Sequence, residues 1–381
     1  MGKMIIAQPF KQELAMTFPK RFVLTALMAG FIGVAHAELP PTLHVVAQSA
    51  NAVWNAVAVD SAGSLYVSGP KWTGSAGPSV SKLDQAGQPH PFPNERWNSN
   101  DATIPAEQRF VNVNAMRVDD NSRLWIVDAG VTDFGGKVIP GGAKVVVVDL
   151  KSGEVIKVIP FDSSIAQEHS YIDDIRLNGK HAYLTDAGVP GIVVLDFETN
   201  KARRVLTTSP AVRAPKNRDI ILSGKVVRAP DGTALRVHSD PLEVSPDGKW
   251  LYFAPLEGPW HKIETRWLDD ANLPEVELIK HVEHWRDLPP VGGTAMDSKG
   301  NFYFSDLAED SVKRIATDGT IQTIAKDTRL HWVDAPAFDN QGRLYLPAAQ
   351  VDRVGLFNDG ASKVERPLSI YRIDPESPLV S

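Results

Sequence analysis

The sequence predicts an all-β fold, a six-bladed β-propeller, because one β-hairpin pattern recurs six times along the 381 residues. Each copy has an apolar strand, a turn of Asp, Asn or Gly residues, and a second apolar strand with an aromatic residue. Such turns tolerate positive φ angles, and β-branched and aromatic residues favour strands. The aromatic residues that mark the six copies are Tyr66, Trp125, Tyr183, Tyr252, Tyr303 and Tyr345.

Further strand pairs follow several of the hairpins, for example Lys144–Leu150 with Glu154–Phe161, Gly191–Phe197 with Lys201–Leu206, and Ser311–Ala316 with Thr320–Ala325. A hairpin and a second pair give four strands, which is the blade of a propeller. Two β-sandwiches would also show short strands and turns, but six copies of one hairpin favour the propeller.

Two further segments are expected to complete the ring. We expect it to close by pairing of Leu43–Ala47 beside Leu368–Ile373 in the last blade. The stretch Thr207–Arg236 is predicted to be an inserted loop or hairpin between the third and fourth blades, either a lid or a plain surface excursion.

The first 37 residues have the pattern of a secretory signal peptide, with Met16 as a plausible true start. Lys20 and Arg21 precede an apolar run from Phe22 to Val34, and Ala35-His36-Ala37 is a small-x-small cleavage signal. We therefore expect cleavage near Ala37, a secreted or periplasmic protein, and one propeller domain over residues 38–381. The apolar run is too short for a membrane anchor, and no later segment reaches spanning length.

Composition bears on the partners and on the stability of the protein. Without residues 1–37, which contain four basic and one acidic residue, the 40 basic and 46 acidic residues become 36 and 45, a net charge of −9. We therefore expect no nucleic-acid partner, because that needs clustered Lys and Arg. With no cysteine, the stability of an exported chain must come from its core rather than from disulfides.

Alignment of the six hairpins reveals a column of short oxygen-bearing side chains, interrupted by one glycine. Counting five positions back from the turn gives Asn55, Asn114, Asp173, Asp240, Gly292 and Asp334. These positions directly precede or begin the strand that lines a propeller channel, so we expect the side chains to converge at one mouth of the channel. Asn and Asp are also favoured before strands because they bond to nearby backbone.

The column allows two kinds of site. As a metal site, Asn55, Asn114, Asp173 and Asp240 would offer oxygen ligands to a divalent cation such as Ca²⁺, Mg²⁺, Mn²⁺ or Zn²⁺. As a site for a small molecule, the ligand-binding residues would be Asn55, Asn114, Asp173, Asp334 and Trp332. The sequence leaves both readings open.

Three histidines precede three of the acids, and imidazole is a common proton carrier near neutral pH. His169, His238 and His331 lie just before Asp173, Asp240 and Asp334, although each is also explained as an ordinary loop residue. The candidate catalytic residues are Asp240, His238 and His331. Four aromatic residues are candidates for the apolar walls of the site or for plain core packing: Tyr171, Trp54, Trp332 and Trp260.

Several motifs together resemble the major royal jelly protein/yellow family, and the match runs in order over roughly residues 50–375. They are Asn114–Asp119 leading to Leu124–Gly130, Tyr171–Ile175, Ser245–Gly248 with Leu251–Leu256, and Leu330–Ala335. The resemblance implies a secreted six-bladed propeller, in which some members convert dopachrome and others bind small amines. Insect members carry cysteines, whereas this chain looks like a bacterial relative.

The polar column also resembles that of the gluconolactonase/regucalcin family, where Glu, Asn, Asn and Asp hold a metal that activates a lactone; here the types differ and Glu is absent. Three functions remain open. They are a royal-jelly/yellow-type site that binds or converts a small molecule, a metal-dependent lactonase, and a non-enzymatic propeller for protein interaction. The sequence does not predict whether the protein is an enzyme, nor its oligomeric state.

Overall fold

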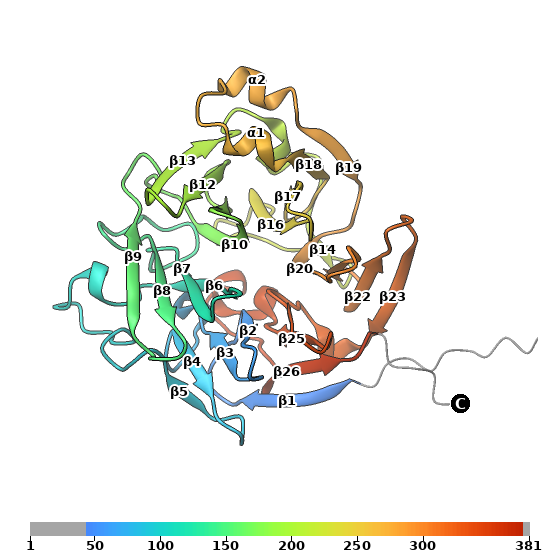
Figure 1. Ribbon diagram of the computed structural model, residues 1–381. Helices are drawn as coiled ribbons and strands as arrows, with labels where there is room; N and C mark the ends of the chain where they lie inside the picture. Colours follow the sequence, from blue (N-terminus) through green and yellow to red (C-terminus); the bar gives the residue numbers. More distant parts are fainter. Residues whose placement is uncertain (1–42, 376–381) are drawn as a thin grey trace, which may run out of the picture. The chain divides into compact units, whose positions relative to one another are not determined.

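The computed structural model describes residues 43–375, which form six four-stranded antiparallel sheets around a central channel (Figure 1). This confirms the predicted all-β, six-bladed propeller. The predicted signal peptide, including Met16 and the cleavage site near Ala37, lies outside the described residues.

Five blades are built from consecutive strands. The first contains β2 (Val57–Val59), β3 (Leu65–Ser68), β4 (Val80–Leu83) and β5 (Pro89–Pro91). The second contains β6 (Val113–Val118), β7 (Arg123–Asp128), β8 (Lys144–Asp149) and β9 (Val155–Pro160). The third contains β10 (Ile172–Asn178), β11 (His181–Asp186), β12 (Ile192–Asp196) and β13 (Lys201–Val205).

The fourth blade contains β16 (Ser239–Val244), β17 (Trp250–Pro255), β18 (Trp260–Glu264) and β19 (Glu283–Arg286). The fifth contains β20 (Val291–Met296), β21 (Phe302–Asp306), β22 (Ser311–Ile315) and β23 (Ile321–Lys326). The first strand of each blade lies next to the first strands of its neighbours, so these strands line the channel.

The sixth blade joins the two ends of the described chain, as predicted. It contains β24 (Ala337–Phe338), β25 (Leu344–Ala348), β26 (Leu368–Ile373) and, as its outer strand, β1 (His44–Ser49). β1 pairs antiparallel with β26, with Ser49 opposite Leu368. This pairing closes the ring and satisfies the hydrogen-bonding groups of β26 that would otherwise form an exposed edge.

Hydrogen bonds explain why the same residue types recur in the hairpins. In four of the six hairpins, the turn aspartate accepts backbone N–H groups of its own turn, and its second oxygen accepts from the aromatic residue six positions later. Trp125 Nε1, for example, donates to Asp119 Oδ2 at 2.9 Å, and Tyr66 OH donates to Asp60 Oδ2 at 3.3 Å. Because this bond fixes the aromatic ring against the next blade, the same residue types recur around the propeller.

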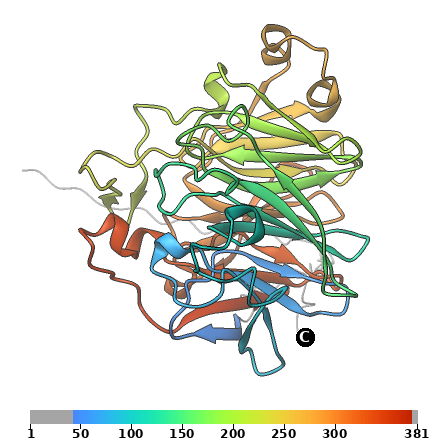
Figure 2. The same ribbon diagram turned by 90° about the vertical axis from the view of Figure 1, so that its left-hand side faces the viewer.

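The stretch predicted to be an insertion leaves the third blade and returns to the fourth. It contains a short 3-10 helix, Pro210–Val212, and a hairpin of β14 (Ile221–Leu222) and β15 (Lys225–Val226). The hairpin projects from the same side of the propeller as the segment that follows β25 (Figure 2). Two short helices, α1 (Thr265–Asp269) and α2 (Glu275–Ile279), connect β18 to β19. Within residues 43–375, the helices are too short to cross a membrane.

Candidate functional site

A β-bulge at the start of four channel-lining strands places the predicted polar column. In β6, β10, β16 and β20 the pairing register shifts at the same point, which leaves two residues of the strand unpaired. Bulges re-aim side chains. The first unpaired residue in the four strands is Asn114, Asp173, Asp240 and Gly292. Asn55 and Asp334 precede β2 and β24, where the backbone of Ala56 bridges to that of Ala335.

Three hydroxyl groups hold this region of the channel together, and the sequence analysis did not identify them. Thr185 Oγ1 accepts from Asp174 N at 3.2 Å and donates to Asp240 O at 2.7 Å, so it joins the third and fourth blades. Ser68 makes the equivalent pair of bonds between the first and second blades, and Ser305 between the fifth and sixth. The bulged backbone groups are thereby satisfied although they leave the sheet ladder.

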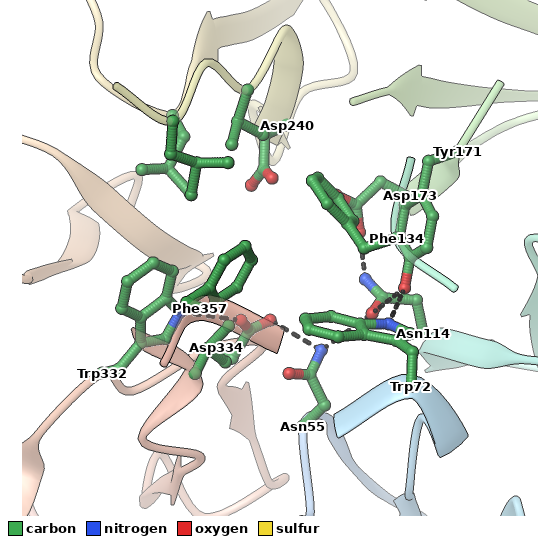
Figure 3. A pocket seen from close by; sticks show the side chains of 14 residues that line it. Asn55, Trp72, Asn114, Phe134, Tyr171, Asp173, Asp240, Trp332, Asp334 and Phe357 are labelled. Atoms are coloured by element: carbon green, nitrogen blue, oxygen red, sulfur yellow. Dashed lines mark hydrogen bonds between the residues drawn. The ribbon is translucent and has the colours of Figure 1, made fainter. Parts of the chain in front are cut away.

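Four of the five polar side chains of the column form a hydrogen-bonded chain (Figure 3). Asn55 Nδ2 donates to Asn114 Oδ1 and to Asp334 Oδ1, both at 3.0 Å. Asn114 Nδ2 in turn donates to Asp173 Oδ1, and the side chain of Asp240 lines the same pocket. The structure therefore brings together the five polar residues that the column predicted; we call them the polar ring.

The fifth blade contributes no side chain to the polar ring because its backbone is covered. A Cβ atom on Gly293 would lie 1.7 Å from Asp334 O, and one on Gly292 would lie 2.6 Å from Val333 O. The loop of the sixth blade thus occupies the space in which a fifth-blade side chain would stand.

Aromatic residues form the wall above the polar ring. Tyr171 OH accepts from Trp72 Nε1 at 2.8 Å and donates to Asn114 Oδ1 at 3.1 Å, which connects the wall to the ring. The rings of Trp72, Phe134 and Phe357 contact one another edge to face or tilted, with centroids 5.5–6.3 Å apart. Trp332 Nε1 donates to Asp334 Oδ2 at 3.2 Å from the other side.

Ring and wall enclose a pocket of about 430 Å³, including space open to solvent. It is lined by Asn55, Trp72, Asn114, Phe134, Tyr171, Asp173, Leu235, Val237, Asp240, Leu256, Trp332, Asp334, Val351 and Phe357. Leu235 lies at the end of the insertion, and Val237 directly follows the insertion. The end of the insertion therefore forms one wall of the pocket. The other predicted wall residues, Trp54 and Trp260, lie in core clusters away from it.

The three carboxyl groups of the polar ring are held against ionisation. Burial raises the pKa of Asp173 well above its ordinary value, and the charge of Asp240 adds to the effect. Burial likewise raises the pKa of Asp240 and of Asp334; the charge of Asp334 adds to the shift at Asp240, and that of Asp173 to the shift at Asp334. Within residues 43–375, these three carboxylates form no ion pair with Lys or Arg. The ring is thus an acidic centre without a countercharge among the described residues.

Below the ring, a balanced group of charges fills the channel. Arg176 Nη1 donates to Asp174 Oδ2 at 2.6 Å and Arg176 Nε donates to Glu243 Oε1 at 2.8 Å. Arg176 Nη2 reaches Thr294 O of the fifth blade at 3.1 Å, and Arg117 lies 3.6 Å from Asp174. Two cations therefore neutralise two anions here, in contrast to the polar ring.

The three histidines do not line the pocket. His238 Nδ1 accepts from Ala214 N at 3.0 Å and its pKa is lowered, first by burial and then by the charge of Arg213. Both ring nitrogens of His331 contact carboxylates, and His169 is exposed near Gly135 O. The structure thus places Asp240 in the lining of the pocket, whereas His238 and His331 are not lining residues.

Within residues 43–375, no group of three or more His, Asp or Glu side chains is arranged to hold a metal ion. Asn55 and Asn114 turn their Nδ2 atoms, rather than oxygen, toward Asp334 and Asp173. In this arrangement the four predicted metal ligands, Asn55, Asn114, Asp173 and Asp240, do not all direct an oxygen atom toward one point. The proposal of a divalent metal stays a prediction.

The fold and the pocket define a class of protein: a six-bladed propeller with an acidic, aromatic-walled site at one channel mouth. The model of the family described as major royal jelly protein matches residues 111–364, more than half of the chain. The chain belongs to the major royal jelly protein family.

Individual relatives are more distant. Protein yellow of Drosophila melanogaster is 25% identical over 225 residues, which cover 55% of this chain and 41% of that protein. The chain therefore matches less than half the length of this curated relative. Protein yellow of Drosophila simulans matches to the same extent.

Two solved structures share the fold. A gluconolactonase from Xanthomonas campestris has a TM-score of 0.51 at 13% identity, over 88% of this chain and 89% of that one. A streptogramin B lyase has a TM-score of 0.50 at 12% identity, over 89% of this chain and 99% of that one. At such identities the likeness shows the propeller fold alone.

Proposed function

We propose that this protein binds a small organic cation, such as an aromatic amine, at the polar ring. The observation that carries the proposal is that three carboxyl groups, of buried Asp173 and half-buried Asp240 and Asp334, line one pocket with an aromatic wall and have no cationic partner among the described residues. Family membership supports it, because binding of small amines is among the activities that the resemblance implies.

Electrostatics favour a cation over a neutral ligand. Like charges at short range, together with burial, disfavour ionisation of Asp173, Asp240 and Asp334. A bound ammonium group supplies one positive charge and three N–H donors, which favours ionisation of a carboxyl group beside it. The carboxamide of Asn55 leaves its Oδ1 atom outside the ring's hydrogen bonds and available to the ligand.

The wall matches the apolar part of such a ligand. Trp72, Phe134 and Phe357 offer ring edges and faces within one pocket, and aromatic faces attract cations within about 6 Å of the ring centre. A pocket with apolar walls and a few convergent polar groups is the usual form of a small-molecule site.

The proposal is tested with a matched pair of probes. Calorimetric titration with phenethylammonium is expected to show binding, whereas the uncharged 2-phenylethanol, of nearly the same shape, is expected to bind at least about tenfold more weakly. Asp240→Asn is expected to reduce the preference for the cation. Asp247→Asn changes an exposed turn residue of the same blade and serves as control. Equal binding of the two probes, or no binding of either, would overturn the proposal.

A metal-dependent lactonase is the second proposal. The charge of Asp240, which raises the pKa of Asp173, favours it, because a cation near both carboxyl groups would relieve this repulsion. A bound cation supplies a Lewis acid that polarises a lactone carbonyl. It predicts lactone hydrolysis that chelation abolishes and Ca²⁺, Mg²⁺, Mn²⁺ or Zn²⁺ restores. Hydrolysis that survives chelation, or no hydrolysis with any of these metals, would exclude it. Turnover of an amine without metal would instead indicate an isomerase of the dopachrome-converting type.

A third proposal, favoured by the signal-peptide pattern of residues 1–37, is that the protein is exported to the periplasm or secreted. N-terminal sequencing of protein recovered from the periplasm and the medium tests it. A mature N-terminus just after Ala37 is expected, and an uncleaved cytoplasmic protein would contradict it.

A further inference from the structure

His331 occupies a buried position between two carboxylates. His331 directly follows the 3-10 helix Thr328–Leu330 and is only 3% exposed. Nδ1 lies 2.7 Å from Asp310 Oδ1 and Nε2 lies 2.8 Å from Asp352 Oδ1. Both ring nitrogens can donate only when the imidazole is protonated, so the geometry is that of an imidazolium with two charge-assisted hydrogen bonds.

The two carboxylates belong to different blades. Asp310 lies in the turn between β21 and β22 of the fifth blade, and Asp352 lies in the 3-10 helix Val351–Arg353 that follows β25 of the sixth. The imidazolium therefore ties the loop that carries it to both blades. Burial by itself lowers the pKa of His331, but the hydrogen bond and charge of Asp352 and the charge of Asp310 outweigh it, so the pKa is raised; Arg353 opposes the rise.

The next residue along the chain reaches the polar ring. Trp332 has a φ angle of 51°, a left-handed conformation that a bulky residue adopts only when its surroundings impose it. In this conformation its indole Nε1 donates to Asp334 Oδ2, and its carbonyl accepts from Ala349 N at 3.0 Å. The backbone on one side of Trp332 is fixed by these bonds, and on the other side by His331.

We propose that His331 is a positioning residue of the cation site: its protonated ring holds Trp332 in the left-handed conformation that aims the indole N–H at Asp334. The proposal rests on the proposed function of the polar ring, which it deepens. It also changes the role expected of His331, since a side chain with both nitrogens engaged away from the pocket carries no proton to a ligand.

The proposal makes cation binding depend on pH in two opposite ways. As pH rises, the ring carboxyls ionise and binding strengthens. Once the pH exceeds the raised pKa of His331, the imidazole loses one donor, either Asp310 or Asp352 loses its partner, and Trp332 is released, which weakens binding. Binding of a cation is therefore expected to pass through a maximum.

The experiment uses phenyltrimethylammonium, whose charge does not titrate, and measures its Kd from about pH 5 to about pH 9, the range around the histidine transition. The wild type is expected to show the maximum. His331→Gln is expected to weaken binding about tenfold at the optimum and to abolish the fall at high pH. Asp352→Asn keeps an acceptor for Nε2 but stabilises the imidazolium less, so the fall should move to lower pH.

The control is a second buried histidine–carboxylate pair. His181 Nδ1 lies 3.2 Å from Asp269 Oδ1 at the start of β11, away from the pocket. His181→Gln should lower thermal stability as His331→Gln does but leave the Kd and its pH profile unchanged. Wild-type affinity and pH profile in His331→Gln would overturn the proposal.

A second readout separates the two proposals. The near-ultraviolet circular dichroism of Trp332, taken as the difference between each protein and its Trp332→Phe variant, is expected to change with pH in the wild type and to lose that change in His331→Gln. If no probe binds but this signal titrates as expected, the proposed function fails and the positioning role stands. A Trp332 signal that ignores both pH and His331 would refute the role itself.

Discussion

Glu257 Oε1 lies 3.7 Å from Arg236 Nη1, and this pair joins the fourth blade to the end of the insertion. Glu257 is fully buried, and neither carboxylate oxygen has a well-formed hydrogen bond among the described residues. Burial raises the pKa of Glu257 to about 7, against the opposing effects of its own backbone N–H and of Arg236. A buried acid of this kind beside two pocket-lining residues, Val237 and Leu256, was not identified from the sequence.

The raised pKa predicts how stability depends on pH. The folded state binds the Glu257 proton more tightly than the unfolded state, so this group favours folding below the ordinary pKa of 4.5, and the advantage is lost as pH rises to about 7. Glu257→Gln removes the ionisation and should raise the free energy of unfolding at pH 8 by about 1–2 kcal/mol, with little change at pH 5. Denaturant unfolding at both pH values measures this. Exposed Glu277→Gln is the control, and equal effects of Glu257→Gln at both pH values would contradict the prediction.

The hydroxyl group of Thr185 should contribute more to the free energy of unfolding than the volume of the side chain does. Thr185→Val keeps the shape but leaves Asp174 N and Asp240 O without their partner, and this should cost about 1–3 kcal/mol of unfolding free energy. Thr185→Ser restores the hydroxyl and should recover most of the loss. A Val variant as stable as the Ser variant would show that the bridge between the blades contributes nothing.

Asn114 links the ring to the aromatic wall, because it accepts from Tyr171 and Asn55 and donates to Asp173. Asn114→Ala should lower the unfolding free energy by about 2 kcal/mol and weaken binding of phenethylammonium. Chemical denaturation and calorimetry test the two effects. Asn121→Ala, in an exposed turn of the same blade, should change neither, and unaltered binding in Asn114→Ala would argue against an organised ring.

Gly293 has no room for a side chain. A methyl group there would overlap the carbonyl of Asp334, so Gly293→Ala must push the sixth-blade loop away from the channel. The expected result is a loss of roughly 3 kcal/mol or more in unfolding free energy together with loss of cation binding. A variant with native stability and affinity would mean that the loop moves freely. Crystallography of the variant would locate the displaced Asp334.

The polar ring could be predicted from the sequence because a repeat fixes the phase of each blade. Once the hairpins were aligned, Asn114, Asp173 and Asp240 fell on equivalent positions, and the bulges place equivalent positions at one height in the channel. The gap at the fifth blade was visible as Gly292, but its cause, the carbonyl groups of the sixth-blade loop, depends on a contact between blades.

The wall of the pocket could not be predicted in this way. Trp72, Phe134 and Phe357 lie in the connections between β3 and β4, β7 and β8, and β25 and β26. These connections differ in length and include 3-10 helices at Trp72 and Phe357, so no sequence period relates one blade to the next. The histidines illustrate the same limit. His238 and His331 precede ring residues in sequence, yet their side chains bond to Ala214 and Asp310 outside the pocket lining. Nearness along the chain predicts nearness in space only where the backbone repeats.

The pairing of β1 with β26 also has a consequence for folding during synthesis on the ribosome. Among the described strands, the first to be synthesised pairs with the last, because Ser49 of β1 lies opposite Leu368 of β26. Until that partner is made, β1 has no strand beside it and is open to other chains. The ring of blades therefore cannot close while the polypeptide is still incomplete.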